Sequence, residues 1–225
     1  MSLFHYHPDI LKSFPNLSGA AMLGKGMRNN PSSEELRHIY NLEQCQVLEK
    51  LGDMPLSEID SLAGWRAAFR LFGVDPTQYR SASEALLRRL TKKGDIPSIN
   101  TIVDICNLVS IRYALPVAAF DLGMISGSIQ VQFATGTEIF KPLGEPSADH
   151  PDPGEVIFSD EAGLVVARRW CWRQSEESAV EENAQDALFT IEAQHDGGKE
   201  AVQCAISDLH ALLNQYAGGE YKRIL

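Results

Sequence analysis

The sequence predicts an α+β fold that forms one domain over residues 1–225. The first observation behind this prediction is the order of the expected elements. Helical patterns fill about residues 30–115, strand patterns fill about 128–193, and one amphipathic helix covers about 199–217. The second is the composition, because 44% of the 225 residues are apolar and 22% are charged, as in soluble globular proteins. A chain of this length is long enough for one large domain with a sizeable core.

The first third of the chain is expected to hold one strand and two helices. The strand covers about residues 17–23 and ends at two glycines. Ser32 or Ser33 caps a helix whose apolar stripe runs through Leu51, since a serine oxygen in this position accepts a bond from a free backbone N–H. Ser57 caps a second helix, which carries one apolar face and ends at a glycine and a proline.

Two further helices are expected before the strands. The pattern Ser-Ala-Ser-Glu at 81–84 is a capping box, and it begins a third helix that stops near Gly94. The fourth helix is longer and runs from about Ser98 to Tyr113. Pro116 follows it and cannot continue a helix.

After Pro116 the patterns are those of strands. Polar and apolar residues alternate over 128–133, as in a half-buried strand. Two apolar runs flank Asp160-Glu161-Ala162-Gly163, which predicts a hairpin. The expected strands are 128–133, 138–143, 155–158, 164–170 and 187–193, with a loop over 144–154.

The segment from Pro97 to Leu122, PSINTIVDICNLVSIRYALPVAAFDL, is the most distinctive part of the chain. It resembles the core of the B3/B4 domain, the editing domain of the phenylalanyl-tRNA synthetase β subunit. There the segment reads roughly as P-I-N-N-V-V-D-x-x-N-Y-V, followed by P-L-H-A-F-D. The resemblance runs from about Tyr79 to about Glu192, roughly half of the chain. It departs at one position, where the family has histidine and this chain has Ala118.

The resemblance implies a B3/B4 (PheT-like) domain, with a mixed β-sheet or barrel-like core and flanking helices. In that family the domain removes wrongly attached amino acids from tRNA. The class II catalytic motifs and the other synthetase modules are not found in the sequence. The resemblance therefore implies a freestanding protein that does not itself charge tRNA.

Three polar residues share one face of the fourth helix, because Asn100, Asp104 and Asn107 are spaced at i, i+4 and i+7. Polar residues on a core-facing stripe require partners. Either they line a pocket, or they tie down neighbouring loops. If they line a pocket, Asn100 and Asp104 place a water molecule for ester hydrolysis and Asn107 binds the substrate. Glu138 is a second group that would orient or deprotonate this water.

A second departure from the family lies at 168–173, Arg-Arg-Trp-Cys-Trp-Arg. Where the family has a glycine-rich segment, bulky aromatic and basic residues stand in this chain. We expect the site to lie between the helix 98–113 and a strand over 164–173. Arg169 and Arg173 would contact a carboxylate or the tRNA end, and Trp172 would shape the pocket. The alternative is that the tryptophans are core residues.

The charge distribution is uneven, although the net charge is −10. Arg88, Arg89, Lys92 and Lys93 lie close together on the third helix and are candidates for RNA binding, since phosphate contacts dominate the affinity for nucleic acids. They would equally serve as a solvated face or as partners in internal salt bridges.

The sequence indicates neither a metal nor a cofactor. The six histidines and four cysteines are scattered, without a C-x-x-C pair. No apolar run approaches the roughly 20 residues that cross a bilayer. The N-terminus lacks the pattern of a secretory signal, so a cytoplasmic protein without a membrane partner is expected.

Three hypotheses for the function remain. The first is a hydrolase that edits mischarged aminoacyl-tRNA in trans, with the aminoacyl end of tRNA as its partner. The second is a non-catalytic module that binds a small amino-acid-like ligand, a nucleotide or the tRNA 3′ end. The third is hydrolysis of an ester or amide unrelated to tRNA, because a shared fold does not fix the chemistry.

Overall fold

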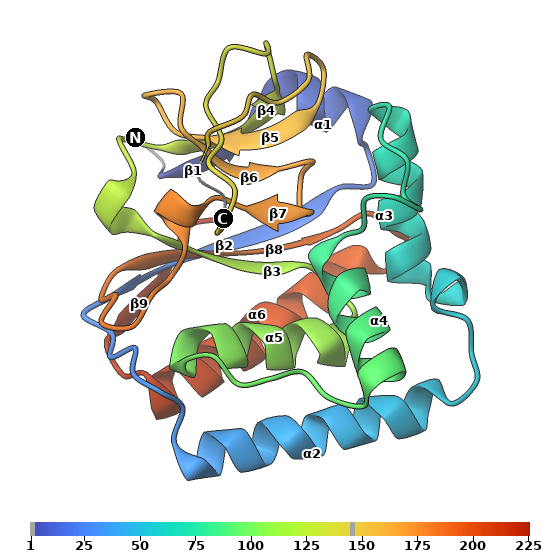
Figure 1. Ribbon diagram of the computed structural model, residues 1–225, viewed down its shortest axis with the longest axis vertical. Coiled ribbons are helices and arrows are strands. Elements are labelled where there is room, and N and C mark those ends of the chain that lie inside the picture. The colour runs from blue at the N-terminus through green and yellow to red at the C-terminus, as the bar shows by residue number, and fades with distance from the viewer. Residues whose placement is uncertain (1–2, 145–146) are drawn as a thin grey trace.

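The computed structural model describes residues 3–144 and 147–225. Its strands form two sheets that lie one above the other, and helices cover the lower sheet on its outer face (Figure 1). α5 Thr101–Tyr113 and α6 Gly198–Tyr216 lie directly beneath the lower sheet, with α2 Glu34–Leu51 below them. The layers are therefore sheet, sheet and helices.

The upper sheet has five strands in the order β1-β4-β5-β6-β7. β1 pairs in parallel with β4, and the other neighbours are antiparallel, so the sheet is mixed. Its outer strands, β1 and β7, do not pair with each other, so the mixed-sheet expectation is confirmed and the barrel-like alternative is not. The strands are β1 Phe4–Tyr6, β4 Ile129–Phe133, β5 Val156–Ser159, β6 Val165–Arg168 and β7 Arg173–Gln174.

The lower sheet is antiparallel, in the order β3-β8-β2-β9. Alternate residues of strand β8, in the interior of this sheet, point to opposite faces and pack into two different cores. Phe189 and Ile191 pack against the helices, whereas Leu188 packs between the sheets. The strands are β2 Ser18–Lys25, β3 Val117–Asp121, β8 Ala187–Ala193 and β9 Glu220–Arg223.

The remaining helices flank the stack. α1 Pro8–Ser13 and α3 Asp60–Leu71 contribute to the core between the sheets. α4 Ala82–Lys93 packs on α5 and α2. Three short 3-10 helices cover Leu56–Glu58, Leu122–Met124 and Glu176–Ser178. Among the described residues, no helix combines the length and the apolar character that crossing a bilayer requires.

Local capping signals predicted the helix ends well. Ser33 Oγ accepts a bond from Leu36 N at 3.2 Å, and Ser81 Oγ accepts one from Glu84 N at 3.3 Å. Gly94 ends α4 with a φ of 83°, in the left-handed region that glycine favours. The predictions for α2, α4, α6, β2, β4, β8 and the hairpin β5–β6 are confirmed.

Other expectations need correction. Ser57 lies in a 3-10 helix and does not cap α3, whose N-cap Ile59 makes no side-chain bond. Residues 138–143 form only isolated bridges and no strand. The strand expected over 164–170 is β6, and it ends at Arg168 because the chain turns there. β1, β3, β7, β9 and α1 were not expected, and residues 145 and 146 of the expected loop lie outside the described residues.

Candidate functional site

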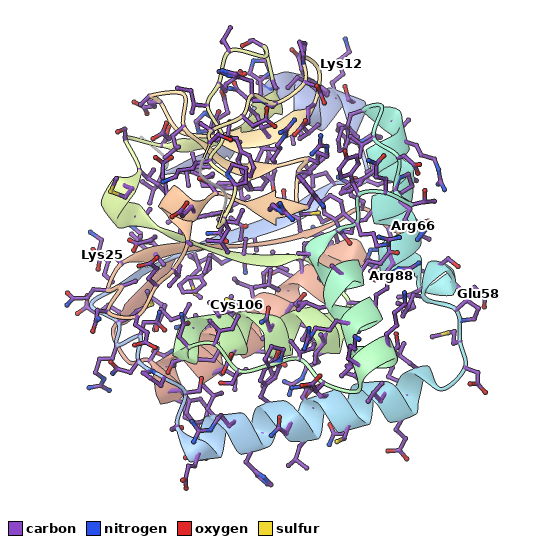
Figure 2. All side chains as sticks on the ribbon, viewed as in Figure 1. Lys12, Lys25, Glu58, Arg66, Arg88 and Cys106 are labelled. Atoms are coloured by element: carbon purple, nitrogen blue, oxygen red, sulfur yellow. The ribbon has the colours of Figure 1, made fainter. Side chains whose placement is uncertain are left out.

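A cavity of about 660 Å³ opens at the β3 edge of the lower sheet. α5 forms one wall and β3 another, while residues 170–175 close the side toward the upper sheet. Figure 1 shows this arrangement, with α5 below β3 and β7 above it. Figure 2 marks Cys106 on α5, which is one of the residues that line the cavity. Two lining residues, Ile99 and Leu143, are 58% and 61% exposed, so they lie at the mouth.

A sharp corner after β6 shapes the upper wall. Arg169 and Trp170 have φ angles of 45° and 59°, a conformation that residues other than glycine adopt rarely. Arg169 N donates to Glu155 Oε1 at 2.8 Å, and Trp170 N donates to the Val156 carbonyl at 2.6 Å. These bonds hold the corner, which turns the Trp170 ring into the core and leaves Trp172 at the cavity. The expected single strand over 164–173 is therefore two strands and a corner.

The buried end of the cavity carries a carboxyl group, that of Glu192 on β8, which is 2% exposed. Tyr6 Oη donates to Glu192 Oε1 at 2.8 Å, and Trp170 Nε1 lies 3.1 Å from both carboxyl oxygens. Each oxygen has two lone pairs, so the group retains capacity for a ligand. Burial raises the pKa of Glu192 to about 7, while the bonds from Trp170 and Tyr6 act in the opposite direction.

Gly19 allows Tyr6 to reach this carboxyl group. Gly19 pairs with Glu192 across the lower sheet, and a Cβ at residue 19 would lie 2.1 Å from Tyr6 Oη. Any side chain at this position would displace the tyrosine. Sequence reasoning did not identify Glu192 as a site residue; the available signal was a single acidic residue in the otherwise apolar and neutral run ALFTIEA.

We expect Glu192 to make stability depend on pH. The folded pKa of about 7 lies above the usual value of 4.5, so the folded state binds the proton more tightly than the unfolded state. The contribution of Glu192 to the free energy of unfolding is therefore fully present below about pH 4.5, and it decreases as the pH rises to about 7. Glu192→Gln should remove this pH dependence, which amounts to a change on the order of 3 kcal/mol in the free energy of unfolding. Urea unfolding between pH 4.5 and 8 measures it, with the exposed Glu200→Gln as control. An unchanged slope in Glu192→Gln would contradict the assignment.

The structure places four of the seven predicted catalytic and substrate-binding residues at the cavity: Asn100, Asn107, Trp172 and Arg173. Asn100 is the N-cap of α5, and its amide is already engaged. Its Oδ1 accepts from Val103 N at 2.9 Å and its Nδ2 donates to the Val180 carbonyl at 2.9 Å. Asn100 therefore holds the wall of the cavity together. Asn107 is half-buried and lines the same wall.

Asp104 is fully buried and is not among the residues that line the cavity. Its carboxylate accepts bonds from Ser32 Oγ at 2.6 Å, from Ile99 N at 2.8 Å and from Ser98 Oγ. These three donors tie two loop segments to α5. The structure thus favours the second of the two interpretations of the polar face for Asp104, a structural one.

Glu138 also lies outside the cavity lining. Its carboxylate accepts bonds from the backbone amides of Thr135, Gly136 and Thr137 at 2.9–3.1 Å. Burial acts to raise the pKa of Glu138, but these amide bonds outweigh it and hold the pKa below the usual range. The group organises a turn.

Arg169 supports the cavity from behind. Its guanidinium carbon lies 3.9 Å from the centre of the Tyr79 ring and 4.6 Å from that of the Trp172 ring. Its nitrogens lie within 4.0 Å of the Asp152 and Glu155 carboxylates. Arg173 is exposed at the mouth, with its guanidinium carbon 4.8 Å from the centre of the Trp172 ring. Arg169 is therefore held between aromatic rings and carboxylates, whereas Arg173 faces the cavity.

A second hollow of about 520 Å³ lies beside the cavity, and we call it the basic hollow. The four predicted RNA-binding residues line it together, with Trp172 and Arg173 shared between the two hollows. Its basic residues are Arg80, Arg88, Arg89, Lys92, Lys93 and Arg173. Among the described residues, no three His, Cys, Asp or Glu side chains cluster as metal ligands.

Comparisons with known proteins agree on one family of domains. Residues 64–211, more than half of the chain, match the model of the B3/4 domain. The phenylalanine–tRNA ligase beta subunit of Shewanella oneidensis is 31% identical over 110 residues, 49% of this chain and 14% of that protein. The same subunit of Chromobacterium violaceum is 33% identical over 78 residues, 35% of this chain and 10% of that protein.

A solved structure shows the same fold at low sequence identity. The N-terminal fragment of the phenylalanyl-tRNA synthetase beta subunit from Pyrococcus horikoshii has a TM-score of 0.51 and 13% identity. It covers 97% of this chain and 49% of that chain. The matched region thus spans about half of the solved fragment and a small share of the curated subunits.

Proposed function

The chain belongs to the B3/4 domain family, and from this premise we propose that it hydrolyses wrongly charged aminoacyl-tRNA in trans. The relatives are beta subunits of phenylalanine–tRNA ligase, whose reaction attaches an amino acid to tRNA. The matches cover only 14% and 10% of the length of these two proteins. A tRNA-related role is thus supported by kinship, and the removal of a wrong amino acid is the function that the cavity supports best.

The observation that carries the proposal is the apolar cavity with Glu192 at its buried end. A volume of about 660 Å³ lies in the range of small-molecule sites, and it accommodates an aminoacyl group with its ribose. Most of the wall is apolar side chain, so the hydrogen-bonding group at the far end selects the ligand. A site that offers a buried acceptor favours amino acids with a donor at the end of the side chain over analogues that lack it.

Ester hydrolysis requires little more than positioning at this site. The water oxygen attacks the carbonyl carbon, the bond from that carbon to the ribose oxygen breaks, and the proton of the water passes to the leaving oxygen. Because an aminoacyl ester is already activated, a placed water and a few donors for the oxyanion are sufficient. Asn107 and backbone N–H groups at the wall would supply these donors. Asp104 and Glu138 lie outside the cavity and are not part of this mechanism.

One observation favours a second candidate, a module that binds the aminoacyl end without cleaving it. Ala118 stands where the family carries histidine, and it lines the cavity. An alanine offers neither a proton acceptor nor a donor, so this wall holds a ligand without assisting the reaction.

Deacylation of charged tRNAs separates the two candidates. We expect turnover of at least one wrongly charged tRNA, beginning with tyrosine on a phenylalanine-specific tRNA, and none of the correctly charged one. The rate should rise in proportion to protein concentration. If no charged tRNA is turned over while the aminoacyl end still binds, hydrolysis is excluded and the binding module stands.

A further inference from the structure

The basic hollow concentrates cations on a chain whose net charge is −10. Six of the 20 lysines and arginines line it, and among the described residues no aspartate or glutamate does. The other residues that line it are Gln78, Ala85 and Trp172. An acidic body with one basic hollow repels a polyanion elsewhere and attracts it here.

In the described part of the chain, the carboxylates that pair with these cations are fewer than the cations. Glu84, buried beneath the hollow, is shared by three arginines. Its Oε1 lies 2.7 Å from Arg66 Nη1, 3.0 Å from Arg88 Nε and 3.7 Å from Arg80 Nε. Arg66 and Arg88 come from neighbouring helices, α3 and α4 (Figure 2). One negative charge therefore fixes three guanidinium groups in place and leaves a surplus of two positive charges.

The two lysines extend the hollow to the end of α4. Lys92 and Lys93 are exposed in its last turn, where the helix dipole favours cations. Among the described residues, neither makes an ion pair, whereas Arg89 lies 3.5 Å from Asp95. Exposed cations without a protein partner are suited to contact phosphate groups.

The basic hollow adjoins the cavity at two residues, Trp172 and Arg173, which line both and which we call the ridge. Aromatic and cationic contacts hold Trp172 of the ridge in place. The rings of Trp172 and Tyr79 form a T-shaped pair with 5.0 Å between their centres, and the Arg169 guanidinium carbon lies 4.6 Å from the centre of the Trp172 ring. A ligand that crosses the ridge enters the cavity at one end and lies among cations at the other.

We propose that the basic hollow binds the phosphates of a single-stranded RNA 3′ end and that the ridge leads its terminal nucleotide into the cavity. The identification of the strand as the end of a tRNA rests on the proposed function. A strand with one phosphate per nucleotide matches the spread of cations along α4. An exposed guanidinium and an indole at the entrance provide surfaces on which a base stacks.

The test is a fluorescence anisotropy titration of a short single-stranded RNA that ends in CCA and carries no amino acid. Lys92→Glu/Lys93→Glu should weaken binding at least about tenfold at 0.1 M salt. It should also lower the salt slope, d log K/d log [salt], by about 1.4, or 0.7 for each lost phosphate contact. Binding should also quench the fluorescence of Trp172, and Trp172→Phe should remove this change.

The matched control is Lys12→Glu/Lys50→Glu, in which both lysines are also exposed and lie in the last turns of helices. Each pair of changes takes the net charge from −10 to −14. If both variants lose the same amount of RNA affinity, the loss is explained by the overall charge and the proposal is overturned. Equal binding by wild type and Lys92→Glu/Lys93→Glu would also overturn it. Because the RNA carries no amino acid, the result is independent of hydrolysis: binding without deacylation contradicts only the proposed function.

Discussion

Replacing Asp104 with alanine is expected to lower the free energy of unfolding by about 3 kcal/mol or more. The carboxylate is fully buried and accepts bonds from two serine hydroxyls and one backbone N–H. Alanine leaves the buried Ser32 hydroxyl without its partner, and it detaches Ser32 and Ser98 from α5. Urea unfolding at pH 7 measures the loss.

The control for this prediction is Asp53→Ala, because Asp53 is exposed in a turn and its loss should change stability by no more than about 0.5 kcal/mol. If Asp104→Ala keeps wild-type stability but loses deacylation, the carboxylate acts in the reaction, as the spacing of Asn100, Asp104 and Asn107 first suggested. Loss of stability with unchanged activity per folded molecule supports the structural assignment.

Filling the cavity with a larger side chain at residue 118 should abolish its function without unfolding the protein. Ala118 is half-buried on β3 and lines the cavity, so the indole of Ala118→Trp occupies the space that we propose for the aminoacyl group. We expect deacylation of the sensitive tRNA to fall at least about 100-fold, the effect of misplacing the reacting group. The midpoint of thermal unfolding of Ala118→Trp should stay within a few degrees of that of the wild type.

Leu71→Trp, at an exposed position of α3, adds an indole outside the cavity and should leave the rate unchanged. A wild-type rate in a folded Ala118→Trp would place the reaction elsewhere on the molecule. If Ala118→Trp instead greatly lowers the affinity for an RNA that carries no amino acid, the cavity binds the terminal nucleotide.

The helices were predictable because their signals are local. Ser33, Ser81 and Gly94 act within one turn of the helix ends that they define. β1 and β3 were missed because their signals are not local. β1 has three residues and exists through its parallel pairing with β4, which lies more than 120 residues away. β3 follows a proline and becomes a strand only where it pairs with β8.

A cavity does lie where the sequence analysis expected a site, between α5 and residues 170–175, but not all of the predicted residues line it. Helical spacing correctly placed Asn107 on a cavity wall, yet it does not show whether a loop or a cavity meets that face, and Asp104 meets a loop. Glu192 depends on Tyr6, which is 186 residues away, and on Trp170 beyond the corner. An alternation pattern does not reveal a corner with positive φ angles, so the predicted strand over 164–173 included it.

A crystal structure with a stable analogue tests the proposed claim that the cavity holds the aminoacyl end of a tRNA. In 3′-aminoacylamino-3′-deoxyadenosine an amide replaces the ester, so the molecule binds without being cleaved. We predict that its tyrosyl form places the side chain within hydrogen-bonding distance of Glu192 and the adenosine against Trp172 and Arg173. An analogue bound outside this cavity, or none bound at saturating concentration, would contradict the claim.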